Sequence, residues 1–107
     1  MQIIKKWLTK FWLEVTSDPA EMRFKDLYVN KTERFSIGIE QRSGRYFLSF
    51  PVANRLCDYE EYYYIDKSIV DNYPANMDEV LVLLAKSRSR ENDNMLIIQP
   101  GADRGSA

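Results

Sequence analysis

The stretch Arg45–Asp66, RYFLSFPVANRLCDYEEYYYID, decides the fold of this chain. Its first part alternates, and the side chains that share one face of the expected strand over 45–52 are Tyr46, Leu48, Phe50 and Val52. The pattern breaks at 53–57, and acidic and aromatic residues then run from Asp58 to Ile65. Such residues favour β-structure, so the sequence predicts two strands of one sheet, the second of them acidic and rich in tyrosine.

The residues before this stretch supply the other half of a hairpin. Residues 34–40, RFSIGIE, alternate as well, and the turn over 41–44 contains Gly44, which can adopt a positive φ. Gly38, in the middle of the first arm, indicates a bulge or a close packing approach. Pro51 cannot donate a hydrogen bond, so the second arm should end near it or lie at an edge. A weaker strand signal covers 24–29.

Helices are expected at both ends of the chain. The face of the helix expected over 3–16 carries Ile3, Ile4, Trp7, Leu8, Phe11, Trp12 and Val15. This helix either docks on the sheet or lies as a basic amphipathic helix on a membrane surface. A short helix over 67–72 should follow an Asp66 cap. The last helix, over 77–90, should begin at an Asn76 cap with Glu79 in the capping-box position and bury Met77, Val80, Leu81, Leu83 and Leu84.

These patterns predict a single α+β domain over residues 1–107. Its antiparallel sheet of three to five strands would pack against an N-terminal and a C-terminal helix. Residues 95–98 are expected to form a last strand, and residues 101–107 a disordered tail, because they carry no apolar anchor.

Composition excludes several classes of function. The 107 residues carry a net charge of −1, and residues 57–107 are the acidic half, with ten acidic against five basic side chains. The chain has no histidine and a single cysteine, which removes histidine-based catalytic dyads and zinc sites and predicts no disulfide. Cys57 is expected to be a small buried hydrophobe. No apolar run could span a membrane and no signal peptide precedes the domain, so a cytoplasmic location is expected.

The candidate site is the acidic and aromatic segment of the second strand. Its residues are Asp58, Tyr59, Glu60, Glu61, Tyr62, Tyr63, Tyr64 and Asp66. Three interpretations are open: a solvated strand face, a surface that recognises a basic protein, or carboxylates that bind a metal or catalyse. In a strand over 58–65, alternate side chains point to opposite faces. One face would carry Asp58, Glu60, Tyr62 and Tyr64, and the other Tyr59, Glu61, Tyr63 and Ile65. The register of the strand decides which face points outward. Nucleic acid is a poor partner for this face, because phosphates would avoid the carboxylates.

The segment from Gly44 to Ile65 resembles a pattern of small bacterial immunity proteins of contact-dependent growth inhibition systems. In that pattern a GRYYLSIPVSN hairpin arm leads into a VDYEEYYEI segment. The strand over 34–40 fits it too, and the helix over 76–90 fits more loosely. Phe47, Phe50 and Cys57 depart from it conservatively, and Tyr64 replaces an acid.

The resemblance implies a cytoplasmic protein that is not an enzyme. It would bind the C-terminal toxin domain of a cognate effector, in many cases a nuclease, and neutralise it stoichiometrically. No cofactor, metal, nucleic acid, membrane or small-molecule substrate is expected, and no oligomeric state is predicted. The alternatives are an adaptor or regulatory module that binds some other protein, and a small carboxylate-based enzyme.

Overall fold

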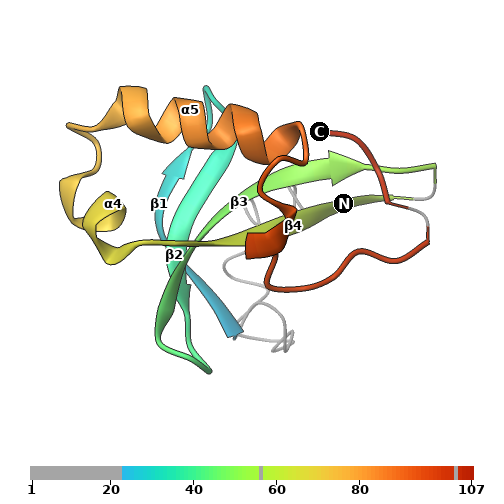
Figure 1. The fold of residues 1–107 in the computed structure, drawn as a ribbon, viewed down its shortest axis with the longest axis horizontal. Helices are drawn as coiled ribbons and strands as arrows, with labels where there is room; N and C mark the ends of the chain where they lie inside the picture. Colours follow the sequence, from blue (N-terminus) through green and yellow to red (C-terminus); the bar gives the residue numbers. More distant parts are fainter. Residues whose placement is uncertain (1–22, 56, 103) are drawn as a thin grey trace.

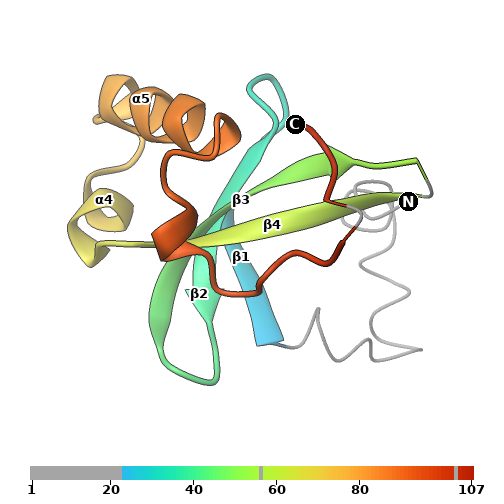
Figure 2. The ribbon, with the colours of Figure 1, turned by 45° about the vertical axis from the view of Figure 1, so that its right-hand side comes forward.

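The computed structural model describes residues 23–55, 57–102 and 104–107. It is an α+β fold with one antiparallel sheet in the order β1-β2-β3-β4, drawn in Figures 1 and 2. The elements are β1 (Phe24–Asn30), β2 (Phe35–Glu40), β3 (Arg45–Ala53), β4 (Asp58–Ile65), α4 (Lys67–Asn72), α5 (Met77–Arg88) and the 3-10 helix η1 (Asp93–Met95). Each expected strand over 24–65 is confirmed, and so are the two helices after β4. The helix expected over 3–16 lies outside the described residues.

The core lies between the sheet and α5. Opposite residues in antiparallel strands share a face, and the pairs Ile37↔Leu48 and Leu48↔Tyr63 run across three strands. Val80 and Leu84 of α5 pack on this face, and Figure 1 shows α5 lying across the strands. The fully buried apolar side chains of this core include Phe35, Ile37, Leu48, Phe50, Tyr63, Val80 and Leu84. The register therefore follows from the alternation of apolar residues in β2 and β3.

The structure explains the positions of Gly38 and Pro51 in the hairpin. A Cβ on Gly38 would lie 2.1 Å from the carbonyl oxygen of Lys25 and 2.7 Å from Cζ of Phe47. Gly38 therefore marks a close approach, and the irregularity in pairing falls across from it, on β1 between Asp26 and Tyr28. Pro51 lies beyond the last β2 pair, Ser36↔Ser49, and faces Glu60 of β4. At this point β4 is the one described strand beside β3, so the missing N–H of Pro51 breaks no ladder on the β2 side.

The expected helix caps are wrong in detail. Neither Asp66 nor Asn76 makes a side-chain cap hydrogen bond. Nδ2 of Asn76 instead donates to the carbonyl oxygen of Ile69, 3.0 Å away, and so ties α5 to α4. The left-handed φ of 68° at Arg90 ends the helical path, and α5 stops at Arg88 instead of continuing to residue 90.

The last strand expected over 95–98 does not form. Met95 belongs to η1, Leu96 makes an isolated bridge to Tyr63, and the N–H of Ile97 donates to the carbonyl oxygen of Tyr62. These contacts place the chain along the outer edge of β4, as Figures 1 and 2 show. The preceding 3-10 turn leaves too few extended residues for a regular strand.

Within residues 101–107, which were expected to form a disordered tail, the described residues make hydrogen bonds to β3. The N–H groups of Ala53 and Ser106 each donate to the other residue's carbonyl oxygen, at 3.1 and 3.0 Å. Polar contacts therefore hold a segment that has no apolar anchor. No helix in the described part of the chain is both long and apolar enough to cross a membrane.

Cys57 is exposed, and not buried as expected. It lies in the turn between β3 and β4, where its N–H donates to Oδ1 of Asn54 and its carbonyl oxygen accepts from the N–H of Asn54. The thiol therefore takes no part in the core.

Candidate protein-binding site on the fourth strand

The register of β3 and β4 decides which face of β4 turns toward the core. Glu61 pairs with Phe50 and Tyr63 with Leu48, and both β3 residues belong to the core beneath α5. Tyr59, Glu61, Tyr63 and Ile65 therefore face the core. Asp58, Glu60, Tyr62 and Tyr64 lie on the opposite face, where all four are half-buried. Asp66 follows the strand and is exposed.

Glu61 is a buried carboxylate within a polar network. Its Oε1 accepts hydrogen bonds from the Tyr63 hydroxyl at 2.8 Å and from Nη2 of Arg104 at 3.0 Å. Its Oε2 accepts from Nε of Arg104 at 2.9 Å and from the Tyr59 hydroxyl at 3.3 Å. Both oxygens are thus occupied by the protein's own donors, as a buried charge requires.

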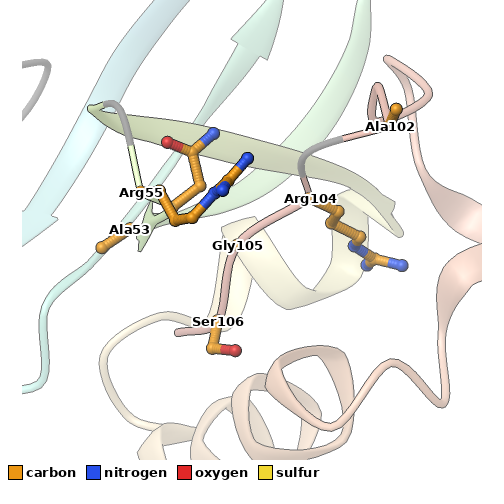
Figure 3. Close-up of a pocket in the computed structure, with 7 residues that line it drawn as sticks. Ala53, Arg55, Ala102, Arg104, Gly105 and Ser106 are labelled. Carbon is orange, nitrogen blue, oxygen red and sulfur yellow. The ribbon is translucent and has the colours of Figure 1, made fainter.

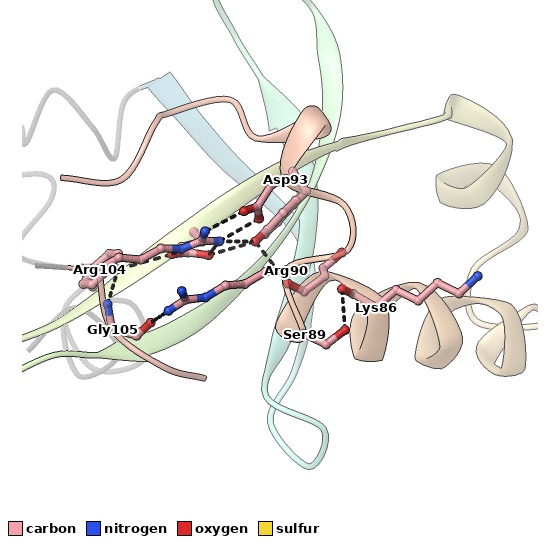
Figure 4. A network of polar contacts seen from close by, with 10 residues as sticks. Lys86, Ser89, Arg90, Asp93, Arg104 and Gly105 are labelled. Atoms are coloured by element: carbon pink, nitrogen blue, oxygen red, sulfur yellow. Dashed lines mark hydrogen bonds and ion pairs between the residues drawn. The ribbon is translucent and has the colours of Figure 1, made fainter. Parts of the chain in front are cut away.

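Arg104 joins Glu61 to a second carboxylate. Its Nη1 lies 2.7 Å from Oδ2 of Asp93, and its Nη2 lies 2.8 Å from Oδ1 (Figure 4). The guanidinium therefore bridges β4 and η1 through bidentate contacts with both acids. The Tyr63 hydroxyl also lies 3.2 Å from the carbonyl oxygen of Ser87, which links the network to the end of α5.

The network fixes the charge of its members near neutral pH. The hydrogen bonds from Arg104 hold the pKa of Asp93 below its usual value, and they outweigh its burial. Burial and the neighbouring Glu61 carboxylate raise the pKa of the Tyr63 hydroxyl. The Tyr63 hydroxyl therefore remains a neutral donor, and the Asp93 carboxylate and the Arg104 guanidinium remain charged.

The opposite face of β4 is aromatic. Tyr62 stacks on Phe24 with ring centroids 3.8 Å apart and lies edge-on to Phe47 at 5.2 Å. The guanidinium carbon of Arg45 lies 3.6 Å above the centroid of the Tyr64 ring, in a cation–π contact. These tyrosines are held by neighbours on β1 and β3, so their rings are positioned by the sheet itself.

The eight expected site residues therefore occupy three environments. Glu61 and Tyr63 are buried, Asp66 is exposed, and the other five, Asp58, Tyr59, Glu60, Tyr62 and Tyr64, are half-buried. The carboxylates of this segment that are not buried are consequently those of Asp58, Glu60 and Asp66. Arg104 and Asp93 were not expected in the site. In the sequence, Arg104 stands in a short polar segment and Asp93 lies in a predicted turn. Neither feature indicates that Arg104 contacts Glu61, 43 residues away in the chain.

A hollow lies beside this network, at the start of β4. Its volume is about 470 Å³, and it is lined by Ala53, Asn54, Arg55, Ala102, Arg104, Gly105 and Ser106. Figure 3 shows the Arg104 side chain extending away from Arg55. The hollow is shallow and polar, and both the C-terminal segment and the turn that follows β3 line it.

Within residues 23–55, 57–102 and 104–107, no group of three or more acidic or cysteine side chains is arranged to hold a metal ion. In comparisons with protein-family models, with curated proteins and with solved structures, nothing matches the chain.

Proposed function

We propose that this chain is a cytoplasmic immunity protein that binds the toxin domain of a contact-dependent growth inhibition effector and neutralises it without catalysis. The observation that carries the proposal is the composite motif over Gly44–Ile65, which resembles the pattern of that family. The motif coincides with β3, β4 and their connection, the part of the sheet that presents acids and tyrosines together.

The chemistry of this surface suits a basic partner. Asp58 and Asp66 carry negative charge at the two ends of β4, and Tyr64 lies between them in sequence on the same strand. Tyrosine rings bury large area with little loss of side-chain entropy, and carboxylates around them speed association with a positive surface. The substrate surfaces of nucleases are basic because they bind phosphates. An acidic protein surface is therefore a suitable competitor for such a site.

Co-purification tests the proposal. The chain would be expressed with a tagged catalytic-domain product of the gene immediately upstream, and the mixture analysed by size-exclusion chromatography and a toxicity assay. We expect a 1:1 complex and full protection of cells from the upstream product. Absence of both binding and protection, with a folded chain, would exclude the immunity function for that pair.

The same experiment distinguishes an immunity protein from an adaptor. An adaptor would bind a protein whose gene is not a toxin, and expression of the chain would not rescue cells from the upstream product. Variants of the half-buried Asp58 and the exposed Asp66, described in the Discussion, then report whether β4 forms the contact surface in either case.

A further inference from the structure

The last described residues, Arg104–Ala107, form a segment that we call the C-terminal strap. Its backbone is fixed at two points: Ser106 pairs with Ala53 at the end of β3, and the N–H of Gly105 donates to the Tyr59 hydroxyl at 2.9 Å. Nη2 of Arg90 donates to the carbonyl oxygen of Gly105, also at 2.9 Å. The strap thus closes over the core-facing side of β4 at its outer end (Figure 4).

Hydrogen bonds and ion pairs hold this strap. Its sequence, RGSA, contains no apolar side chain larger than that of alanine. Release would therefore expose little apolar surface, the quantity that makes global unfolding costly. Asp93, one of the two acids that hold Arg104, is 41% exposed at its side chain, so water and salt reach that end of the network. Local opening should consequently require less free energy than unfolding of the sheet.

Closure of the strap conceals a site for a guanidinium group. In the closed form Arg104 satisfies both oxygens of Glu61, whose side chain is 6% exposed, and contacts the Tyr63 hydroxyl. Departure of Arg104 would leave a carboxylate that is buried and unpaired, which is strongly unfavourable. The open form therefore favours entry of another guanidinium, with Glu61, Asp93 and Tyr63 already arranged to receive it.

We propose that the C-terminal strap is releasable, and that Arg104 occupies in the free protein a site that takes an arginine side chain of the protein partner in the complex. The second half of this statement rests on the proposed function, because that function supplies a basic partner. In the free protein the strap keeps Glu61 paired, and in the complex the partner's arginine replaces Arg104 and adds Tyr59, Glu61 and Tyr63 to the contact surface.

Gly105 offers a way to open the strap without altering any charge. A Cβ at this position would lie 2.2 Å from the carbonyl oxygen of Ala53, whereas nothing lies within 4 Å of a Cβ at Gly101. Gly105→Ala should therefore displace the strap, and Gly101→Ala is the matched control. Both variants retain Arg104, Glu61 and Asp93.

Amide hydrogen exchange measures the opening. In the wild-type chain the Ser106 amide should exchange about 100-fold faster than the amides of the β3–β4 core, because local opening suffices. Gly105→Ala should remove the remaining protection of Ser106, and the urea midpoint of the whole domain should fall no further than it does in Arg104→Ala. Exchange of Ser106 at the rate of the core amides would overturn the proposal, since the strap would then open only with the whole fold.

Methylguanidinium serves as the probe of the vacated site. It should raise the melting temperature of Arg104→Ala more than that of the wild type at equal ionic strength, and Arg104→Ala with Glu61→Gln should lose this gain. If Arg104→Ala does not fold, the same titration is made on Gly105→Ala by NMR of the Tyr63 ring. Equal responses in wild type and variant would contradict a guanidinium site.

The partner gives the final test. Gly105→Ala should bind the upstream toxin domain several-fold more tightly than wild type, and Gly101→Ala should bind like wild type. An unchanged or weaker affinity of Gly105→Ala would overturn exchange of arginines. If wild type forms no complex, yet the exchange and probe experiments succeed, the proposed function fails and the releasable strap stands.

Discussion

Nε of Arg104 lies 2.9 Å from Oε2 of Glu61, although 43 residues separate the two in the chain. The side chains are 13% and 6% exposed, so this is a buried ion pair with a second contact from Nη2 to Oε1 at 3.0 Å. The pair anchors the polar C-terminal segment to β4. It also removes Glu61 from the carboxylates that β4 presents to a partner.

Loss of this pair should destabilise the fold. We expect Arg104→Ala to lower the free energy of unfolding by about 3 kcal/mol, because it leaves the Glu61 carboxylate buried without its cation. Arg104→Lys should recover only part of this loss, since an ammonium cannot form the bidentate contact. Urea unfolding at pH 7 measures both. Arg104→Ala with Glu61→Gln removes the orphaned charge and should be more stable than Arg104→Ala alone. Equal stability of these two variants would contradict the explanation.

Gly38 should not tolerate a side chain. Gly38→Ala places a Cβ against the carbonyl oxygen of Lys25 and the ring of Phe47, so β1 must shift. We expect a loss of about 2 kcal/mol or more in the free energy of unfolding, from overpacking in the sheet. Thermal unfolding followed by circular dichroism measures the change. Gly101→Ala, which meets no atom within 4 Å, should leave the melting temperature unaltered.

Stability should fall in acid through Glu40. Burial of this carboxylate raises its pKa, but hydrogen bonds from Ser43 and Arg23, with further ones from the backbone, outweigh that effect and lower the pKa from 4.5 to about 2. Because the pKa of the folded state is the lower one, Glu40 stabilises the fold above pH 4.5, and this contribution is lost as the pH falls toward 2. The loss should amount to about 3 kcal/mol at most.

The variant Glu40→Gln isolates this effect. Urea unfolding between pH 7 and pH 3 should show a smaller decline for Glu40→Gln than for wild type, from a lower value at pH 7. The reason is that the amide cannot form the ion pair with Arg23, whose Nε lies 2.6 Å from Oε2 of Glu40. Parallel pH profiles for the two proteins would assign the acid sensitivity to other carboxylates.

Reversing charge on β4 should weaken binding to a basic partner. Substitution of both Glu60 and Glu61 by lysine is the test that the sequence alone suggests. Because Glu61 is buried, its substitution would also disturb the fold. Asp58→Lys with Asp66→Lys tests the accessible charge instead, and we expect about a tenfold slower association at low salt. Stopped-flow binding to the upstream toxin domain measures it, and the difference should shrink at high salt.

A matched control carries the same change in net charge elsewhere. Glu33 and Glu79 are exposed, in the β1–β2 turn and in the first turn of α5. Glu33→Lys with Glu79→Lys should associate at a rate close to wild type. If both pairs of substitutions slow association equally, only net charge matters and β4 is not the contact surface.

Local patterns predicted the sheet well for a physical reason. In β2 and β3 the alternation of apolar side chains is regular, and burial of one face admits a single register. The turn at Gly44, with a φ of 75°, and the close approach at Gly38 were equally visible, because only glycine meets those backbone requirements. In β4 both faces mix polar and aromatic residues, so the sequence left two orientations open, and pairing with Leu48 and Phe50 selects one.

Two features that sequence reasoning missed depend on contacts between separate segments. Asn76 has the residue type and position of a cap, but its amide finds a partner in α4 and does not cap α5. The strap lacks apolar residues and was expected to be disordered, since nothing in its composition indicates that Arg104 reaches two acids.

The sequence by itself determined the order and type of the elements from β1 to α5, the hairpin register and the acidic, tyrosine-rich character of β4, because these follow from periodicity and from backbone requirements of single residues. Only the tertiary structure decided which carboxylates of β4 remain at the surface. Glu60 and Glu61 are adjacent and chemically alike, yet Glu61 lies on the side of the strand that α5 and the strap cover, and Glu60 lies on the opposite side, where it is half-buried. Burial of Glu61 is stable only because Arg104 arrives from the far end of the chain, and no local pattern encodes that meeting.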